Sequence, residues 1–126
     1  MKKILSVMFI VLFMIVLTGC SNEPTGKISN VSVNGSEVTL DISLREKSDD
    51  YRIILAYVYL RIDDDVVDSI SIPIDDIPGE HKGLKFSGLE PNTQYTLQIY
   101  VYYRDENDEI TGMSNAILDT TQFTTK

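Results

Sequence analysis

The 126-residue chain has no tryptophan, one cysteine and one histidine, and its 11 basic residues are outnumbered by 19 acidic ones. A lone cysteine cannot form an intramolecular disulfide, so the fold must rest on its hydrophobic core. The sequence also has no phosphate-binding loop, CxxC or HExxH pattern, and His81, in "PGEHKG", is typical of a solvated turn histidine. Because no nucleophile stands beside a base, we expect no catalytic residues, no cofactor and no enzyme.

The net charge of −8 argues against nucleic acid and anionic lipid headgroups as partners. An acidic surface repels the phosphates of nucleic acid and of anionic lipids. We therefore expect the folded part of the chain to bind neither nucleic acid nor lipid headgroups directly.

The first 19 residues differ in composition from the rest. Lys2 and Lys3 precede an uncharged apolar stretch at residues 4–17, and small residues follow. This order is typical of a secretory signal peptide, and the apolar stretch falls short of the roughly 20 residues that cross a bilayer.

The stretch "LTGC" that ends this segment resembles the lipobox of bacterial lipoproteins, and its Cys20 is the only cysteine of the chain. The resemblance implies that residues 1–19 are removed and that Cys20 carries the lipid. Two or three acyl chains give a stable anchor, so we expect a protein bound to the exported side of a cell membrane, extracellular or periplasmic. Residues 20–26 would then be the lipidated cysteine and a flexible tether.

From residue 27 onward the hydrophobic period is two, which is typical of strands with one solvated face. Val38, Leu40, Ile42 and Leu44 alternate with polar residues. Further strands are predicted around 31–33, at 51–62, at 66–74 with Pro73 marking an edge, around 84–86, at 95–104 and at 114–123. Seven short strands without a helical period predict an all-β fold, a seven-stranded antiparallel β-sandwich over residues 27–126.

The stretch "LEPNTQY" resembles the segment that leads into strand F of fibronectin type III domains, which are immunoglobulin-like sandwiches. The resemblance implies a structural corner made by Leu89, Pro91 and Tyr95, in which the Tyr95 ring is buried and its hydroxyl bonds to upstream backbone. Family domains usually have a core tryptophan in strand B, which this chain lacks, so Leu40 or Ile42 would fill that space.

Four tyrosines are candidates for a binding face. If Ala56, Val58 and Leu60 face the core, the alternation turns Tyr57, Tyr59, Tyr100 and Tyr102 outward on neighbouring strands. Clustered tyrosines are frequent in protein interfaces and also stack on sugars. The alternative is that these rings only stabilise an open sheet face through cross-strand contacts.

Acidic residues gather in three loops, and within "DENDEITG" the residues Asp105, Asn107 and Glu109 alternate loosely as calcium ligands do. Solvated charged loops are the simpler interpretation. Together these features predict a surface-anchored lipoprotein whose fibronectin type III-like domain is a non-catalytic protein interaction or adhesion module of the bacterial envelope. The alternative is an accessory module that binds glycan or Ca²⁺. The sequence names no partner.

Overall fold

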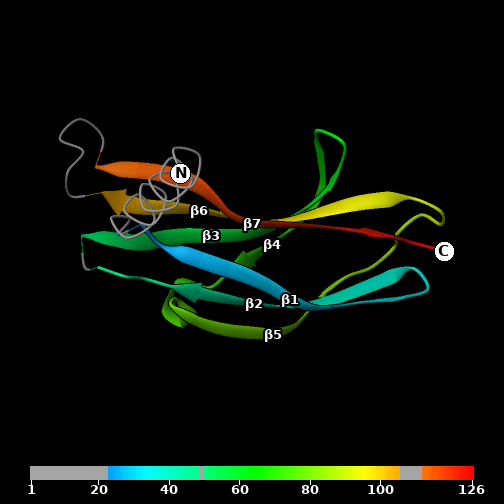
Figure 1. Ribbon diagram of the computed structural model, residues 1–126, viewed down its shortest axis with the longest axis horizontal. Helices are drawn as coiled ribbons and strands as arrows, with labels where there is room; N and C mark the ends of the chain where they lie inside the picture. Colours follow the sequence, from blue (N-terminus) through cyan, green and yellow to red (C-terminus); the bar gives the residue numbers. More distant parts are fainter. Residues whose placement is uncertain (1–22, 49, 106–111) are drawn as a thin grey trace, which may run out of the picture.

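The computed structural model describes residues 23–48, 50–105 and 112–126. Within these ranges the chain forms seven strands and one 3₁₀ turn (Figure 1): β1 (Thr25–Asn34), β2 (Glu37–Arg45), β3 (Tyr51–Ile62), β4 (Asp65–Ile72), η1 (Ile74–Asp76), β5 (Gly79–Phe86), β6 (Gln94–Asp105) and β7 (Met113–Thr124). No helix in these ranges has the length and apolar character to cross a membrane.

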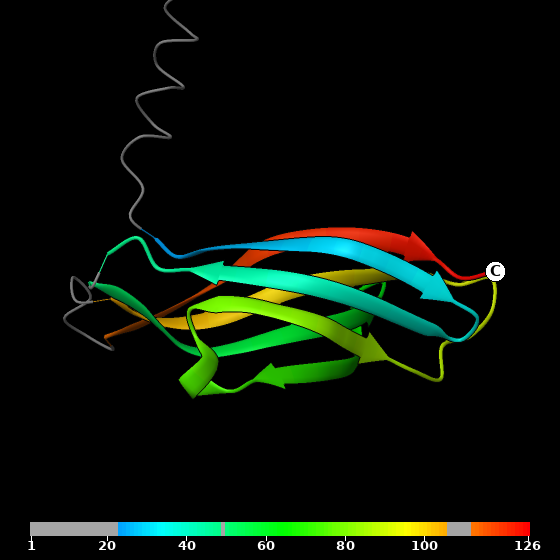
Figure 2. The ribbon, with the colours of Figure 1, turned by 90° about the horizontal axis from the view of Figure 1, so that it is seen from below.

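The strands form two antiparallel sheets packed face to face. One has the order β1-β2-β5 and the other the order β4-β3-β6-β7. Figure 1 shows β7, β6 and β3 above β1, β2 and β5, and Figure 2 views the molecule from the side of the three-stranded sheet. This is an immunoglobulin-like β-sandwich; the alternation of the sequence predicted the sandwich, and the resemblance of "LEPNTQY" implied its immunoglobulin-like type.

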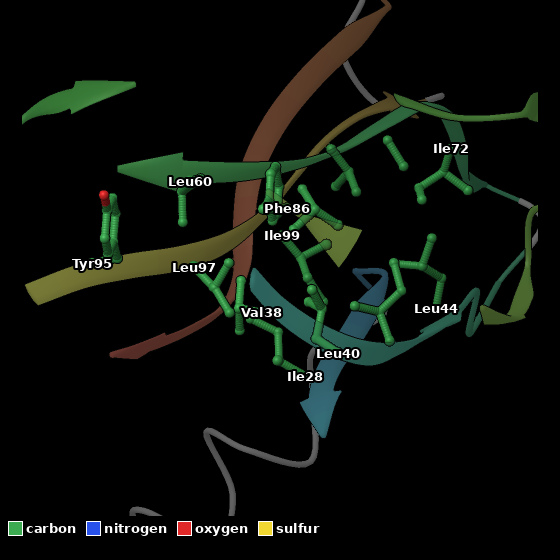
Figure 3. Close-up of a cluster of buried hydrophobic side chains, with 14 of the residues drawn as sticks. Ile28, Val38, Leu40, Leu44, Leu60, Ile72, Phe86, Tyr95, Leu97 and Ile99 are labelled. Carbon is green, nitrogen blue, oxygen red and sulfur yellow. The ribbon is translucent and has the colours of Figure 1, made fainter. Parts of the chain in front are cut away.

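The core lies between the sheets and is built from the alternate residues of each strand (Figure 3). Leu40 is fully buried and Ile42 is 2% exposed, so both occupy the interior of β2 as expected for a domain without tryptophan. Ala56, Val58 and Leu60 of β3 also face inward, each less than 3% exposed. The predicted phase of β3 is therefore correct, and its remaining alternate residues point away from the core.

One side of the sandwich is closed by contact between β1 and β7. The backbone N–H of Ile28 donates a hydrogen bond of 2.7 Å to Oδ2 of Asp119. A Cβ added to Gly26 would lie 3.1 Å from the Leu118 side chain, so the two strands approach closely and leave little room for a side chain at this position. The other side carries the edge strands β4 and β5, and Pro73 follows directly after β4 as an edge position permits.

Two details of the sequence interpretation were wrong. Strand β1 begins at Thr25 and Pro24 is buried, so the predicted tether of residues 20–26 is shorter at its C-terminal end. His81 lies in β5 rather than in a solvated turn, and its Nε2 is buried without a hydrogen-bond partner. The stretch "PGEHKG" has the composition of a turn, but its residues from Gly79 onward belong to β5. Gly83 lies at a bulge of this strand, where glycine is common.

Candidate binding face

The four tyrosines form one continuous cluster on the outer face of the four-stranded sheet. Tyr57 lies across from Tyr100 in the pairing of β3 with β6, and Tyr59 and Tyr102 are the next outward residues of these strands. The ring centroids are 5.8 Å apart for Tyr57 and Tyr59, 5.5 Å for Tyr59 and Tyr100, and 5.3 Å for Tyr100 and Tyr102. Each of the four side chains is partly exposed. The sheet thus brings together all four residues selected from the sequence; we name this group the tyrosine cluster.

The rings contact one another through their faces and edges. Tyr57 and Tyr59 stack at an interplanar angle of 12°, whereas Tyr102 meets Tyr100 at 74°. Desolvation among these neighbours raises the pKa of Tyr59 and of Tyr100, and the hydroxyl of Tyr102 adds to the effect at Tyr100. Packing among the rings therefore favours the neutral phenols of Tyr59 and Tyr100.

Arginines stand at both ends of the cluster. Arg52 lies directly across from Arg104 at the end near the β2–β3 and β6–β7 loops. At the other end Arg61 donates hydrogen bonds to Oε1 of Gln98, at 3.1 Å, and to the backbone oxygen of Asp64. Both acceptors of Arg61 are neutral, so these bonds fix the guanidinium without cancelling its charge.

No carboxylate occupies an outward position among the paired residues of this sheet in the described part of the chain. The outward residues are those that share a face with the tyrosines: Val66, Ser69 and Ser71 on β4; Arg52, Leu55, Tyr57, Tyr59 and Arg61 on β3; Gln94, Thr96, Gln98, Tyr100, Tyr102 and Arg104 on β6; Met113, Asn115, Ile117, Thr120, Gln122 and Thr124 on β7. We name this surface the tyrosine face. Acidic side chains begin only beyond its ends, at Asp105 and at the β3–β4 turn.

The outer face of the three-stranded sheet has the opposite composition. Its outward positions include carboxylates and amines, such as Glu37 and Lys85, whose charged atoms lie 3.7 Å apart. No aromatic residue occupies an outward position in the described pairs of β1, β2 and β5. The contrast identifies the tyrosine face as the distinctive surface of the domain.

Tyr95 belongs to the scaffold and not to this face. Its side chain is 3% exposed, stacks on Phe123 at 5.4 Å, and its hydroxyl accepts a 2.8 Å hydrogen bond from the N–H of Glu90. Leu89 is buried beneath the same loop, and Pro91 lies exposed at its turn. The three residues therefore form the corner that joins β5 to β6.

The acidic loops have partly structural roles. Oε2 of Glu46 accepts a 2.7 Å hydrogen bond from the N–H of Ile53, which fixes the β2–β3 connection. Asp75 and Asp76 line a hollow of about 630 Å³ together with Glu80 and His81. Asp105 ends β6, and the candidate ligands Asn107 and Glu109 lie outside the described residues, as Cys20 does. Within the described ranges no group of three or more His, Cys, Asp or Glu residues is arranged to hold a metal ion.

Sequence reasoning missed Asp41, which joins the three strands of the smaller sheet. Its carboxylate accepts hydrogen bonds from Nδ2 of Asn30 on β1, at 2.8 Å, and from the N–H of Gly83 on β5, at 2.9 Å. These bonds lower the pKa of Asp41, the bond from Asn30 having the larger effect. Asn30 and Gly83 both have a positive φ, at 52° and 68°. The contact depends on the bulges between Ser29 and Ser32 of β1 and between His81 and Leu84 of β5, which no local sequence pattern marked.

Comparison with known proteins gave no further identification. No protein-family model, no curated protein and no solved structure matches this chain.

Proposed function

We propose that the chain is an exported, lipid-anchored protein whose immunoglobulin-like domain is a non-catalytic interaction or adhesion module, with the tyrosine face as its binding surface. The observation that carries the proposal is the composition of this face. Tyrosine, arginine and methionine are enriched in the centres of protein interfaces, and lysine, glutamate and aspartate are depleted there. The tyrosine face follows this pattern in a chain that has 19 acidic residues.

The dimensions of the face also suit a protein partner. From Arg52 to Arg61 the strands extend about 30 Å, and four strands side by side span about 19 Å. The resulting area of roughly 600 Å² approaches the 800 Å² or so that each partner buries in a standard interface. A flat face of this size fits another protein surface better than a small molecule.

The alternative, a glycan, is less well supported by the ring geometry. A sugar stacks on an aromatic ring whose face is open to solvent. Tyr57 and Tyr59 each cover one face of the other, and Tyr102 presents its ring edge-on to Tyr100. The cluster therefore offers hydroxyl groups and ring edges more than open ring faces.

The proposal also includes membership of the fibronectin type III-like domains and attachment of the chain to the cell envelope. The "LEPNTQY" motif, the strand order and the Tyr95 corner all support membership at the level of a divergent fibronectin-like domain. The "LTGC" sequence supports lipidation at Cys20. A Cys20→Ser variant should move the protein from the membrane fraction to the soluble fraction, and retention in the membrane would contradict the anchor.

The binding proposal is tested by site-specific photo-cross-linking on intact cells that carry the full chain. A photoreactive residue at Ile117, which is 50% exposed beside Tyr100, should give a discrete cross-linked protein product. The double change Tyr57→Ser and Tyr100→Ser should abolish this product without loss of folding.

The control places the photoreactive residue at Thr39, which points outward on the opposite sheet. Thr39 should give no cross-linked product; a product of equal yield from Thr39 would show that the tyrosine face is not the binding surface. A product from Ile117 that persists in the double variant would contradict the proposal.

A further inference from the structure

We propose that residues 65–69 of β4, which we name the open edge, form a second binding site. Its occupant is an extended basic segment of another polypeptide, which adds to the sheet beside β4 and places an arginine in the adjoining hollow. This inference goes beyond the proposed function, because the site is separate from the tyrosine cluster. It is drawn from the exposure of β4, the hollow beside it and the carboxylates around both.

The open edge is exposed on both faces of the sheet. The residues from Asp65 to Ser69 are all exposed, whereas Ile70 is half-buried and Ile72 is buried farther along the strand. β4 pairs with β3 alone, and in the view of Figure 2 it lies beyond β5, which does not cover it. Because an edge strand presents unpaired backbone N–H and C=O groups, the open edge can accept a further strand.

A bulge adds to the accessibility of the open edge. The pairing of β4 with β3 shifts between Leu60 and Arg61, which makes Val67 the extra residue of β4. A bulge leaves its extra residue outside the ladder. The Val67 side chain is 50% exposed and that of Val66 is 47% exposed. Two apolar side chains are therefore available to a partner at this edge.

A hollow of about 210 Å³ lies between the open edge and the corner that precedes β6. Its apolar lining includes Leu60, Val67 and Leu89, and two acidic residues, Asp68 and Glu90, line it as well. Sites for small molecules usually exceed about 300 Å³. The hollow therefore suits a single side chain of a larger partner.

Arginine matches this combination of apolar lining and carboxylates. Its stem packs on apolar surface while its charged head stays among polar groups, and its hydrogen bonds to carboxylates are among the strongest in proteins. The Asp68 carboxylate is held against the backbone of β4, since its Oδ1 accepts a 2.8 Å hydrogen bond from the N–H of Ser69. An ionised carboxylate accepts several hydrogen bonds through its two oxygens, so Asp68 can accept from an arginine as well.

The surroundings of the hollow are acidic, and the domain does not neutralise them with ion pairs. Residues 63–65, all aspartates, lead into β4 and are exposed. In the described part of the chain neither these aspartates nor Asp68 nor Glu90 forms a salt bridge. Arg61 bonds to the backbone oxygen of Asp64 rather than to a carboxylate. A basic segment would therefore meet negative charge along the whole open edge.

Charge also argues against a second copy of this chain as the occupant. Two open edges paired with each other would bring the carboxylates of Asp65 and Asp68 from both copies together, and like charges on paired strands are destabilising. Charged side chains and bulges are features by which edge strands avoid such self-pairing. A basic segment makes the same charges attractive.

The test uses the full lipid-anchored chain in neutral lipid nanodiscs and two fluorescent peptides. One peptide alternates arginine with threonine and the other alternates glutamate with threonine, because threonine favours extended strands. Fluorescence anisotropy measures binding at about 0.15 M salt, where a Debye length of about 8 Å limits attraction to charges near the site. The arginine peptide should bind and the glutamate peptide should not.

Matched substitutions then locate the site with the net charge held equal. Asp68→Asn with Glu90→Gln should weaken binding of the arginine peptide about fivefold, since each exposed charge pair contributes a few-fold. The control pair is Asp50→Asn with Glu80→Gln, at the opposite end of the sandwich. It should change binding less than about twofold.

Amide hydrogen exchange tests the added strand. When the arginine peptide is bound, exchange should slow at residues 65–69 and stay unchanged in β5, the free edge of the other sheet. Val67→Lys, which places a positive charge at the open edge, should remove this protection. Val33→Lys is the control, because Val33 is also exposed, at 37%, but lies on β1.

Three outcomes would overturn the inference: equal binding of the two peptides, equal weakening by the two pairs of substitutions, or binding without slower exchange at residues 65–69. The Ile117 cross-link does not depend on this site, because β7 and β4 are opposite edges of the sheet. The open edge and the tyrosine face can therefore each be refuted while the other stands.

Discussion

The hydroxyl of Tyr95 lies 2.8 Å from the backbone nitrogen of Glu90, five residues upstream, and accepts its N–H. This bond holds the loop between β5 and β6 against the end of the core, where Leu89 is buried. The C-terminal end of the domain is attached to the same loop, since the N–H of Thr93 donates to Oγ1 of Thr125 at 3.0 Å. The Tyr95 hydroxyl thus stabilises the β5–β6 loop, to which the C-terminal end of the domain is also bonded.

Removal of this hydroxyl should destabilise the domain. A Tyr95→Phe variant leaves the N–H of Glu90 without its acceptor, at a cost of about 1 kcal/mol in the free energy of unfolding. Urea denaturation measures the difference. Tyr102→Phe, on the outer face, is the control and should unfold within about 0.5 kcal/mol of the native sequence; equal stabilities of all three proteins would contradict the role of the corner.

Stability should depend on the ionisation of Asp41. Its pKa is lowered in the folded protein by the bonds from Asn30 and Gly83, so its contribution is present above the unfolded pKa of about 4 and is lost as pH falls through the folded pKa. Asp41→Asn should lower the melting temperature near neutral pH, and this difference should shrink at about pH 3. Asp68→Asn serves as control because the Asp68 carboxylate accepts a hydrogen bond from the N–H of Ser69, its neighbour on the same strand; a pH-independent difference for Asp41→Asn would refute the linkage.

Replacement of His81 by an apolar residue should stabilise the domain. Nε2 of His81 is buried without a partner, and an unsatisfied buried group costs about 1 kcal/mol or more. His81→Leu keeps a side chain of similar volume and removes the polar atom, so its melting temperature should rise. Lys82→Leu tests whether added hydrophobicity alone has this effect; a lower melting temperature for His81→Leu would show that the imidazole has a partner in solution.

Alkaline pH should destabilise the protein through its tyrosines. Desolvation raises the pKa of Tyr59, Tyr100 and Tyr103 in the folded state, so the stability that they contribute is complete below the unfolded pKa of about 10 and is lost as pH rises. Ultraviolet titration of tyrosinate should show delayed ionisation in the folded protein and normal ionisation in urea. Tyr59→Phe should reduce the delayed fraction, and titration of all tyrosines at the normal pKa would contradict the packing of the cluster.

The architecture could be predicted from the sequence because hydrophobic alternation and turn residues are local signals. The alternation of β2 and β6 predicts their buried faces, and "LEPNTQY" predicts the position of the corner. The outward direction of Tyr57 and Tyr100 followed from the same period of two.

The bulges and the pairing between distant strands could not be predicted in this way. Asp41 meets Asn30 and Gly83 only because two bulges bring them to one carboxylate, and their residues are separated by 11 and 42 positions from Asp41. The absence of acids from the tyrosine face likewise required the register of four strands, including the shift between Ile99 and Tyr100. Such relations depend on tertiary contacts that no local pattern contains.

The close contact between β1 and β7 has a mechanical consequence. The two strands run in the same direction, so β1 begins at one end of the sandwich and β7 finishes at the opposite end (Figure 1). Tension between the proposed N-terminal membrane attachment and a load at the far end would therefore be directed along the strands. Extraction of β1 would have to break its ladder with β2 and the Ile28–Asp119 bond together rather than one at a time. A pull along the strands would therefore load the β1–β2 ladder and the Ile28–Asp119 bond in shear, all at the same time.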